Sequence, residues 1–292
     1  MITLRQLEIF VAVADSEHVT EAAKRLHLSQ SAVSAALAEL TERLGGVLFD
    51  RVGRRVRLND RGRRLQAAAH DLLERTADLV RTFRSDEQVT GRLRVGASST
   101  IGMYLLPATI GRFAESHPGV EIDLEIGNSE AIEAALAARS LDVGFVEGPP
   151  REPQVEAAAW RDDELVVFAR TGDPLARRRR LPLAQLAAAR WVLREAGSGT
   201  RAVFESALQA HGLRVTPAVT MGHSEAVKSA VRAGLGIGCL STMALRTELA
   251  AKEFARLRVP ELDLRRRLWR LVRRGGYASA LQRAFVAFCD VR

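Results

Sequence analysis

The sequence predicts an α/β protein of several domains, with a small helical head, one long helix and a larger region of alternating strands and helices. Three observations support this fold class. Residues 20–44 read as two short helices joined by a tight turn, leucines recur every seven residues from position 65, and strand and helix patterns alternate after Gly91. With 292 residues, 47% of them hydrophobic, the chain can bury a sizeable core and divide into about two or three domains.

The head begins with a predicted helix over residues 4–15, followed by the helix pair. Thr20 can cap the first helix of the pair and Ser29 the second, because hydroxyl oxygens accept hydrogen bonds from the free amides at a helix start. Apolar side chains at helical spacing form the buried stripe of the second helix. These are Val33, Leu37, Leu40 and Leu44. The opposite face is small and polar.

This arrangement is typical of a helix-turn-helix module, whose second helix lies in the major groove of DNA with its first residues at the base edges. A Gln can pair with adenine through two hydrogen bonds, and a Ser can pair with several bases. The candidate base-contacting residues are Ser29, Gln30, Ser31, Ser34 and Ala35. An ordinary helical hairpin in a core is the alternative for this segment taken alone.

The net charge of +8 is concentrated directly after the helix pair, where residues 51–64 hold seven arginines against the single acid Asp60. Arginines alternate with apolar residues around Gly53, which predicts a short β-hairpin wing that reaches the DNA phosphates. The candidate phosphate contacts are Arg51, Arg54 and Arg55. A solvated arginine face is the alternative.

A long helix follows, which Asn59 or Asp60 can cap. Leucines recur along it every seven residues, each followed four positions later by a second seam residue, as in a coiled coil. The seam consists of Leu65, Leu72 and Leu79 with Ala69, Thr76 and Phe83. A head of sixty residues is too small to bury it, so we expect a second copy to cover it and to form a homodimer that binds two half-sites. Burial against the C-terminal region is the alternative. We assign residues 1–58 to the winged helix-turn-helix head and 59–88 to the linker helix.

From residue 91 onwards, strands alternating with helices predict a mostly parallel sheet in two lobes. Helices are expected over residues 103–116 and 278–290, and strands include residues 120–126, 163–170 and 268–274. We assign residues 91–292 to an effector-binding domain. Lobe I covers about 91–162 and 267–292, and lobe II about 163–266.

Hydroxyl-rich turns follow several of these strands. Open α/β sheets bind ligands at the carboxyl ends of their strands, and free amides at a helix start with nearby hydroxyls suit a carboxylate, phosphate or sulfate. The candidate ligand residues are Ser98, Ser99, Thr100, Asn128, Ser129, Ser198, Gly199, Thr200 and Arg201. Arg201 adds a bidentate donor for an oxyanion. Glu147 and His223 can contact a ligand or serve the fold alone. A plain helix cap explains any one of these turns by itself.

Other classes of protein find little support. GASST and GSGTR do not fit the G-x-S-x-G nucleophile elbow, the histidines lack metal-ligand spacing, and GLGIG lacks the third Gly of a dinucleotide loop. We therefore expect no enzyme, metal or cofactor. No export signal and no apolar run of about twenty residues is evident, which predicts a cytoplasmic protein without a membrane span. Cys239 and Cys289 are expected to be buried, reduced thiols, with a redox pair as the alternative.

The head, LRQLEIFVAVADSEHVTEAAKRLHLSQSAVSAALAELTERLGGVLFDR with the arginine-rich wing, resembles the DNA-binding domain of LysR-type transcriptional regulators. The resemblance covers the whole chain and implies a linker helix and a two-lobed effector domain like the periplasmic-binding proteins. LRVGASSTIGMYLLP and LREAGSGTR resemble the branch that includes regulators of sulfur assimilation and carbon-fixation genes. Many members have Pro in place of Ser31, a basic or amide residue in place of Ala35, and a small polar residue in place of His223.

The resemblance implies a regulator whose binding to double-stranded promoter DNA responds to a small effector, and the hydroxyl-rich turns with Arg201 predict that this effector is an anion. It implies a homodimer and usually a homotetramer, and it leaves RNA polymerase open as a further partner. The rival hypothesis is a cytoplasmic solute-binding protein without a DNA function. A gel shift on the chain's own upstream DNA separates the two.

Overall fold

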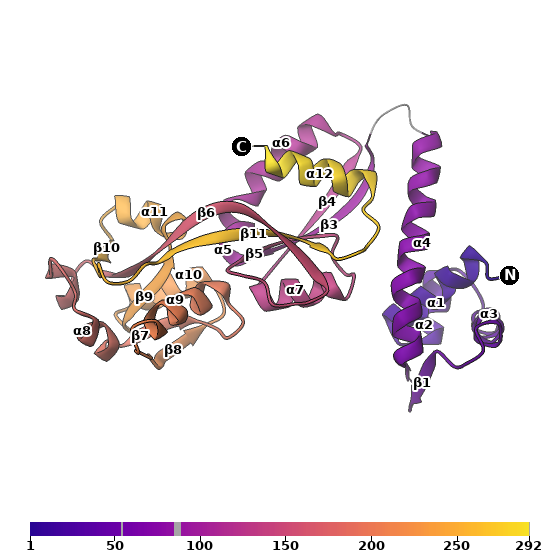
Figure 1. Cartoon of the computed structure of the whole chain (residues 1–292), viewed down its shortest axis with the longest axis horizontal. Coiled ribbons are helices and arrows are strands. Elements are labelled where there is room, and N and C mark those ends of the chain that lie inside the picture. The colour runs from indigo at the N-terminus through magenta and orange to yellow at the C-terminus, as the bar shows by residue number, and fades with distance from the viewer. Residues whose placement is uncertain (54, 85–88, 292) are drawn as a thin grey trace. The chain divides into compact units, whose positions relative to one another are not determined.

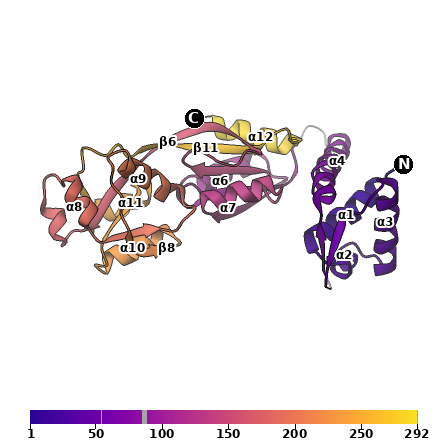
Figure 2. The same cartoon turned by 60° about the horizontal axis from the view of Figure 1, so that its bottom comes forward.

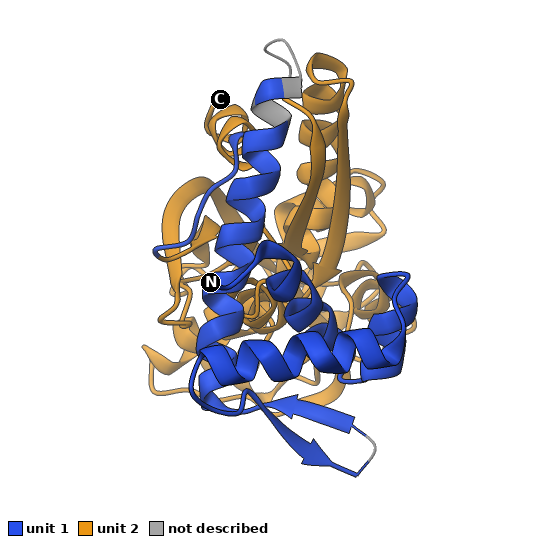
Figure 3. Ribbon diagram, turned by 90° about the vertical axis from the view of Figure 1, so that its right-hand side faces the viewer, with its two compact units in different colours: residues 1–88, 275–280 blue, residues 89–274, 281–292 orange. Residues whose placement is uncertain are grey.

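The computed structural model describes residues 1–53, 55–84 and 89–291 (Figures 1 and 2). The chain divides into two compact units, which are drawn in different colours in Figure 3. Unit 1 comprises residues 1–88 and 275–280, and unit 2 comprises residues 89–274 and 281–292. The junction at 85–88, between the expected linker helix and the effector-binding region, lies outside the described residues, as does residue 292.

Unit 1 contains three helices, a two-stranded wing and one long helix. They are α1 (Leu4–Ser16), α2 (Val19–Arg25), α3 (Gln30–Arg43), β1 (Phe49–Val52), β2 (Arg55–Leu58) and α4 (Asp60–Arg84). Phe10, Val33 and Leu40 are fully buried where α1 and α3 meet the rest of the head. The expected cap of α2 is wrong, because α2 starts after His18 rather than after Thr20. The Ser16 hydroxyl donates to His18 O (3.0 Å) and accepts from His18 N (3.4 Å), which fixes the turn at that point.

The long helix α4 is joined tightly to the head. Asn59 Oδ1 accepts a hydrogen bond from Gly62 N (2.9 Å) and so caps the helix. A Cβ atom at Gly62 would lie 2.1 Å from the carbonyl oxygen of Leu48, so only Gly allows this close approach. Ala69 is fully buried and Leu65 packs beside it in the core of the head. The expectation that the head buries none of the seam is therefore wrong for the first half of α4.

Unit 2 begins with alternating strands and helices. These are β3 (Gly91–Ser98), α5 (Ser99–Tyr104), α6 (Leu106–Ser116), β4 (Val120–Gly127), α7 (Ser129–Ala137), β5 (Val143–Glu147) and β6 (Val155–Arg170). The single helix expected over residues 103–116 is two helices. Pro107 stands in the first turn of α6, where its missing N–H and fixed φ favour a new helix start and oppose a continuation of α5.

The remaining elements of unit 2 return to the first strands. These are the 3₁₀-helix η1 (Pro174–Arg177), α8 (Leu183–Ala188), β7 (Trp191–Arg194), α9 (Gly199–Gln209), β8 (Pro217–Met221), α10 (Ser224–Arg232), β9 (Ile237–Ser241), α11 (Thr242–Ala250), β10 (Phe254–Leu257), β11 (Arg265–Arg273) and α12 (Ala280–Asp290). Phe285 of α12 packs into one hydrophobic core with Leu93 of β3 and Phe145 of β5.

The sheet order is β4-β3-β5-β11-β6-β9-β7-β8, with β10 paired to β6. β3 runs parallel to β4 and β5, and β7 runs parallel to β8 and β9. The two long strands between these groups, β6 and β11, are antiparallel to their neighbours. The expectation of a mostly parallel sheet is therefore wrong at its centre, because both strands cross from one core to the other.

Individual residues show where β6 and β11 pass from the core that contains β3 to the core that contains β7. On β6, Trp160 packs in the core that contains β3, whereas Leu165 packs in the core that contains β7. On the returning strand, Leu264 packs in the second core and Leu268 in the first. Asp163 and Arg266, which lie between these pairs, therefore mark the point where both strands pass between the cores. Among the described residues, no helix combines the length and apolar character that a bilayer span requires.

Candidate functional sites

The start of α3 presents a polar, solvent-exposed face. Ser29 Oγ accepts a hydrogen bond from Ala32 N (3.1 Å), which confirms Ser29 as the cap of this helix. Its hydroxyl also lies 2.9 Å from that of Ser31. All five candidate base-contacting residues are exposed, namely Ser29, Gln30, Ser31, Ser34 and Ala35. The helix therefore buries its stripe and leaves the predicted reading face free for a partner.

The wing is an antiparallel pair in which Val52 faces Arg55, and Gly53 has a φ of +63° that suits its tight turn. It is held to the end of α1, because Val56 N donates to Glu17 O (2.9 Å) and Arg57 pairs with the Glu17 carboxylate (3.6 Å). Arg51 and Arg55 are exposed and have no side-chain partner within the described residues. Arg54 lies outside the described residues. The two described candidate arginines are thus free to meet phosphates.

In unit 2, polar groups from α5, α9 and β11 meet at the carboxylate of Glu147, at the end of β5. Its Oε1 accepts from the backbone N of Thr100 on α5 (2.9 Å). Its Oε2 accepts from the hydroxyl of Thr200 on α9 (2.7 Å) and from Nη1 of Arg266 on β11 (3.2 Å). The predicted residues Thr100, Glu147 and Thr200 are therefore brought together, around an arginine that the sequence analysis missed.

Arg266 extends this cluster into an ion-pair network. Its Nε donates to Asp163 Oδ2 (2.7 Å), and the side chains of Arg266, Glu147 and Asp163 are each 1% exposed. The hydroxyl of Ser241, at the end of β9, donates to Asp163 Oδ1 (2.8 Å). Nη1 of Arg266 also donates to the Thr200 hydroxyl (3.0 Å). Buried charges are tolerated only when they are paired and hydrogen-bonded in this way.

The electrostatics of the cluster keep Glu147 ionised. Burial by itself would raise the pKa of this carboxyl group, because a dry environment disfavours the charged form. The positive charge of Arg266 and the hydrogen bonds from Thr100 and Thr200 outweigh that effect and lower the pKa of Glu147 to about 2. At neutral pH the cluster therefore contains a fixed carboxylate.

The start of α9 packs directly on the end of β5. A Cβ atom at Gly199 would lie 1.9 Å from the carbonyl oxygen of Glu147 and 2.6 Å from Ser129 Oγ. Ser129 Oγ itself lies 3.3 Å from Glu147 O and 3.4 Å from Glu147 N. Gly199 and Ser129 thus hold the Glu147 backbone, and any side chain at Gly199 would push the two elements apart.

A second arginine missed by the sequence analysis, Arg194 at the end of β7, also connects the two halves of unit 2. It is buried, and its guanidinium donates to the hydroxyls of Ser99 on α5 (3.1 Å) and Ser224 on α10 (3.2 Å). Glu195 neutralises it through contacts of 2.7 and 2.8 Å. The predicted residue Ser99 is therefore part of a second interaction beside the Glu147 cluster.

The other predicted ligand residues have different surroundings. Asn128 and Ser198 cap α7 and α9, and the His223 ring nitrogen accepts from Glu225 N (3.4 Å) as the cap of α10. Arg201 bonds to Glu205 (2.7 Å) and to the carbonyl oxygen of Arg194 (3.2 Å) instead of joining Glu147.

Ser98 differs from all of these residues. Its hydroxyl is buried and has no hydrogen-bond partner among the described residues. Buried hydroxyls are normally satisfied, so an unpaired one requires an explanation.

One of the missed residues had a signal in the sequence. Arg266 alternates with Leu264 and Leu268, both of which are buried, so the period-two pattern of a strand places Arg266 on the inward face. An inward arginine needs a carboxylate partner. Nothing in the local sequence identifies Asp163 as that partner, because the pair is 103 residues apart.

The two thiols lie in different cores, Cys239 with β7 and Cys289 with β3, and both are free and buried. Burial raises the pKa of each thiol to about 12, which leaves them protonated at neutral pH. In the part of the chain that the structure describes, no group of three or more metal-ligating side chains occurs.

Comparisons with known proteins agree with these observations. Residues 4–63 match the family model of the bacterial regulatory helix-turn-helix protein, lysR family, and residues 86–291 match the LysR substrate binding domain. The chain is 45% identical to the helix-turn-helix transcriptional regulator YeiE of Escherichia coli K12, over 99% of this chain and 97% of that one. It is 35% identical to the RuBisCO operon transcriptional regulator of Allochromatium vinosum, over 98% and 95% of the two chains.

Among solved structures, the regulatory domain of CcmR from Synechocystis PCC6803 in complex with 2-PG is similar to unit 2. It has a TM-score of 0.63 and 31% identity, and the match covers 68% of this chain and 96% of that one. The two family models together span nearly the whole chain, and the expected fold class of a helix-turn-helix head with a LysR-type effector domain is confirmed. The chain belongs to the LysR family of bacterial transcriptional regulators.

Proposed function

We propose that this regulator binds promoter DNA through α3 and the wing, and that a small anion bound beside the Glu147 cluster changes how it binds. The observation that carries the effector site is the meeting of donors from α5, α9 and β11 at one carboxylate. A set of amides, hydroxyls and guanidinium groups that holds an internal carboxylate has the chemistry that recognises an external oxyanion.

For the DNA, we assign base contacts to Gln30 and its exposed neighbours, and phosphate contacts to Arg51 and Arg55. We assign base contacts to α3 because its start can enter the major groove. We assign phosphate contacts to the wing because it carries guanidinium groups without a partner among the described residues. A gel shift on the chain's own upstream DNA tests this part. The absence of a specific complex would favour the solute-binding alternative.

For the effector, the ion pairs of the two arginines indicate which of them can bind an added anion. The Arg266 pairs are fully buried and costly to break, whereas the side chains of Arg201 and Glu205 are 21% and 43% exposed. A partly exposed pair four residues apart on a helix contributes about 0.5 kcal/mol. Arg201 can therefore leave Glu205 for an oxyanion at little cost, while Glu147 and Arg266 keep the two halves of unit 2 together.

Ser98 supplies a second argument for a ligand at this place. Its unpaired hydroxyl directly precedes Ser99 and Thr100, whose groups bond to Arg194 and to Glu147. A phosphate or carboxylate oxygen would satisfy it. We infer an effector of this class because CcmR, a relative of similar regulatory domain, was solved with 2-PG.

The test is calorimetry with 2-phosphoglycolate and with sulfate on the full chain. Arg201→Ala and Thr200→Val should each weaken binding at least about tenfold, the effect of losing one charge-assisted or buried hydrogen bond. Arg214→Ala removes an exposed arginine elsewhere in unit 2 and serves as the control. Unchanged affinity in Arg201→Ala would move the anion away from the start of α9. A parent chain that binds neither probe would remove this class of anion.

A ligand shifts a regulator between DNA-bound states only through its different affinities for those states. Thr200→Val should therefore keep DNA binding and lose the response to the effector.

For assembly and location, we propose a homodimer through the exposed half of α4, associating further into a homotetramer, in the cytoplasm where its DNA lies. The residues available on α4 are Leu72, Leu79, Val80 and Phe83, all exposed. RNA polymerase is a further partner that the family suggests, and co-purification on promoter DNA tests it. We assign the chain no catalytic role. We retain the division into a head at 1–58, a linker helix at 59–88 and an effector-binding domain at 91–292 with its two lobes.

A further inference from the structure

The carboxylate of Asp78 on α4 is buried against a segment from near the end of the chain. Asp78 is 6% exposed. Its Oδ2 accepts from the hydroxyl of Tyr277 (2.7 Å) and from the backbone N of Ala280 (2.9 Å). The guanidinium group of Arg75, one turn earlier on α4, lies 5.1 Å from the centre of the Tyr277 ring. Residues 275–280 therefore pack on α4 and belong to unit 1 (Figure 3).

Asp78 provides a cap for α12, which starts at Ala280. The first amides of a helix have no partner inside the helix. A carboxylate that accepts from such an amide satisfies it, and its charge is favourable at the positive end of the helix dipole. Caps usually come from the residue directly before the helix, whereas Asp78 and Ala280 are 202 positions apart. A side chain of the linker helix α4 therefore holds the first turn of α12.

The rest of α12 belongs to unit 2, which the chain enters at Leu281. Leu281 and Phe285 are buried in the core that contains β3 and β5. Near the end of the helix, the carbonyl oxygen of Cys289 accepts from Nε1 of Trp160 on β6 (2.8 Å). One helix is thus held by α4 at its first residue and by the core of unit 2 along its length.

The same core lies next to the proposed effector site. β3 ends at Ser98 and β5 ends at Glu147, and both residues belong to that site. Phe145, two residues before Glu147, lies edge-on to Phe285 of α12, with ring centroids 6.5 Å apart. Close-packed interiors transmit strain because they contain little free volume. A shift at the end of either strand is therefore passed on to α12.

We propose that residues 275–280 couple the effector site to the linker helix, with Asp78 as the positioning residue at the junction. This inference rests on the proposed function, because it concerns the regulation of that effector site. Asp78 lies about 100° around α4 from its neighbour Leu79, on a different face from the apolar residues proposed for the dimer. The segment and a second copy can therefore contact α4 at the same time. A movement of α12 then acts on the helix that joins the two heads of the proposed dimer.

DNA provides a test that needs no effector. Coupling between two sites is reciprocal, so DNA binding should change α12 just as an effector should change DNA binding. Hydrogen–deuterium exchange of the full chain is measured by mass spectrometry, with and without the chain's own upstream DNA. In the parent, the DNA should change the exchange rate of residues 281–290 at least about fivefold. In Asp78→Ala this change should be lost while the DNA still binds.

The second test uses 2-phosphoglycolate. The dissociation constant for the upstream DNA is measured with and without this probe, and the ratio of the two values should be at least about five in the parent. Asp78→Ala should lower the ratio to about one, the value of an uncoupled pair of sites. A residue that only stabilised the fold would leave this ratio as it is in the parent.

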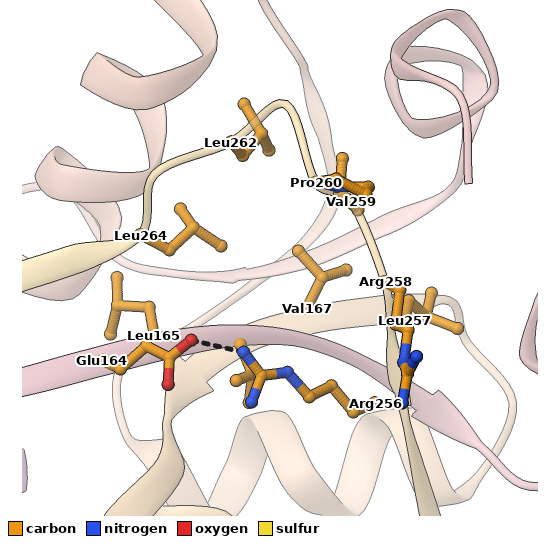
Figure 4. A pocket seen from close by; sticks show the side chains of 11 residues that line it. Glu164, Leu165, Val167, Arg256, Leu257, Arg258, Val259, Pro260, Leu262 and Leu264 are labelled. Carbon is orange, nitrogen blue, oxygen red and sulfur yellow. Dashed lines mark hydrogen bonds and ion pairs between the residues drawn. The ribbon is translucent and has the colours of Figure 1, made fainter. Parts of the chain in front are cut away.

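Three further variants complete the experiment. Tyr277→Phe removes one of the two hydrogen bonds, so it should reduce the ratio without abolishing it, and it replaces Asp78→Ala if that variant does not fold. Asp60→Ala removes an exposed acid at the start of α4 and should keep the parent's ratio. Arg256→Ala breaks an exposed ion pair with Glu164 in unit 2 (Figure 4) and should also keep it. Melting temperatures and light scattering confirm that each variant folds and assembles like the parent.

The outcomes separate this inference from the proposed effector site. A parent chain whose DNA binding does not respond to 2-phosphoglycolate removes that effector, and the exchange experiment still decides whether α12 is coupled to α4. The coupling is overturned if Asp78→Ala keeps the DNA-induced change in α12 or keeps the parent's ratio with 2-phosphoglycolate. A parent in which DNA leaves the exchange of residues 281–290 unchanged would overturn it as well.

Discussion

Glu147 and Arg266 form an ion pair in which both side chains are 1% exposed, with Arg266 Nη1 3.2 Å from Glu147 Oε2. The two residues come from strands that start 122 positions apart in sequence, β5 at Val143 and β11 at Arg265. Since no solvent screens the pair, removal of one partner leaves a buried charge with less compensation. The pair therefore stabilises the fold of unit 2 and also holds the candidate effector site together.

We predict that Glu147→Gln lowers the free energy of unfolding at neutral pH by about 3 kcal/mol, a typical cost of breaking a buried pair. Gln keeps the size of the side chain and part of its hydrogen bonding, so the loss reports mainly on charge. Urea denaturation of parent and variant at pH 7 measures it. A difference below about 1 kcal/mol would mean that Asp163 alone compensates Arg266.

The same pair predicts a pH dependence. The pKa of Glu147 is about 2 in the folded chain against 4.5 as its ordinary value. Between these two values the unfolded chain binds more protons than the folded one, so stability rises with pH and is lost as the pH falls toward 2. The contribution of this group is about 3 kcal/mol. The stability gap between parent and Glu147→Gln should accordingly shrink from pH 6 to pH 3, and a constant gap would contradict the lowered pKa.

Ser98→Ala should separate stability from binding. The Ser98 hydroxyl has no hydrogen-bond partner in the part of the chain that the structure describes, so its removal should leave the melting temperature unchanged or raise it. Ser241→Ala is the contrast, because that hydroxyl donates to Asp163 (2.8 Å) and its loss should cost about 1–3 kcal/mol. If Ser98 contacts the effector, calorimetry with 2-phosphoglycolate should show weaker binding in Ser98→Ala. A less stable Ser98→Ala would mean that the hydroxyl already has an unrecognised structural role.

Gln30→Ala and Arg55→Ala should affect DNA binding differently. Loss of a base contact at Gln30 should reduce the preference for specific DNA by about 1–3 kcal/mol. Loss of a phosphate contact at Arg55 should weaken all sequences alike and reduce the salt slope by about 1 per subunit. Arg57→Ala is a control, because that arginine already pairs with Glu17. Equal losses of specific and non-specific binding in Gln30→Ala would remove its assignment as a base contact.

Leu72→Asp should split the dimer and abolish operator binding. Leu72, Leu79 and Phe83 on α4 are 48%, 58% and 83% exposed, which leaves a contiguous apolar face for a second copy. A buried unpaired charge should raise the dissociation constant of the dimer more than about a hundredfold. Ala77→Asp places the same charge on an exposed position of α4 away from this face. Light scattering of both variants gives the answer, and a dimeric Leu72→Asp would exclude this face as the interface.

The sequence predicts local features of this chain well. Ser29 as the cap of α3, the hairpin around Gly53 and the strand at 120–126 all follow from residue type and spacing. It predicts less well where the periodicity is overridden by a helix-breaking residue or by packing against another element. Pro107 splits a helix that periodicity alone would continue. Leu65 and Ala69 pack in the core of the head, although their spacing is that of a coiled coil.

For the candidate site, the hydroxyl residues at the strand ends can be predicted from the sequence, because each turn is formed by neighbouring residues. The long-range contacts that join them, Arg266 with Asp163 and Arg194 with Ser99, depend on which strands become neighbours. Strand order in a sheet is set by the packing of the whole unit, so no spacing in the sequence specifies it.

The paired crossing strands also give the second core the character of an insertion. Glu164 and Arg265, the residues at which the chain leaves and re-enters the first core, are direct neighbours across the β6–β11 ladder. The roughly one hundred residues between them form a loop whose two ends already touch, and closing such ends with a short turn adds little chain entropy. The segment can therefore be regarded as an insertion into the first core, made at one place on the β6–β11 ladder.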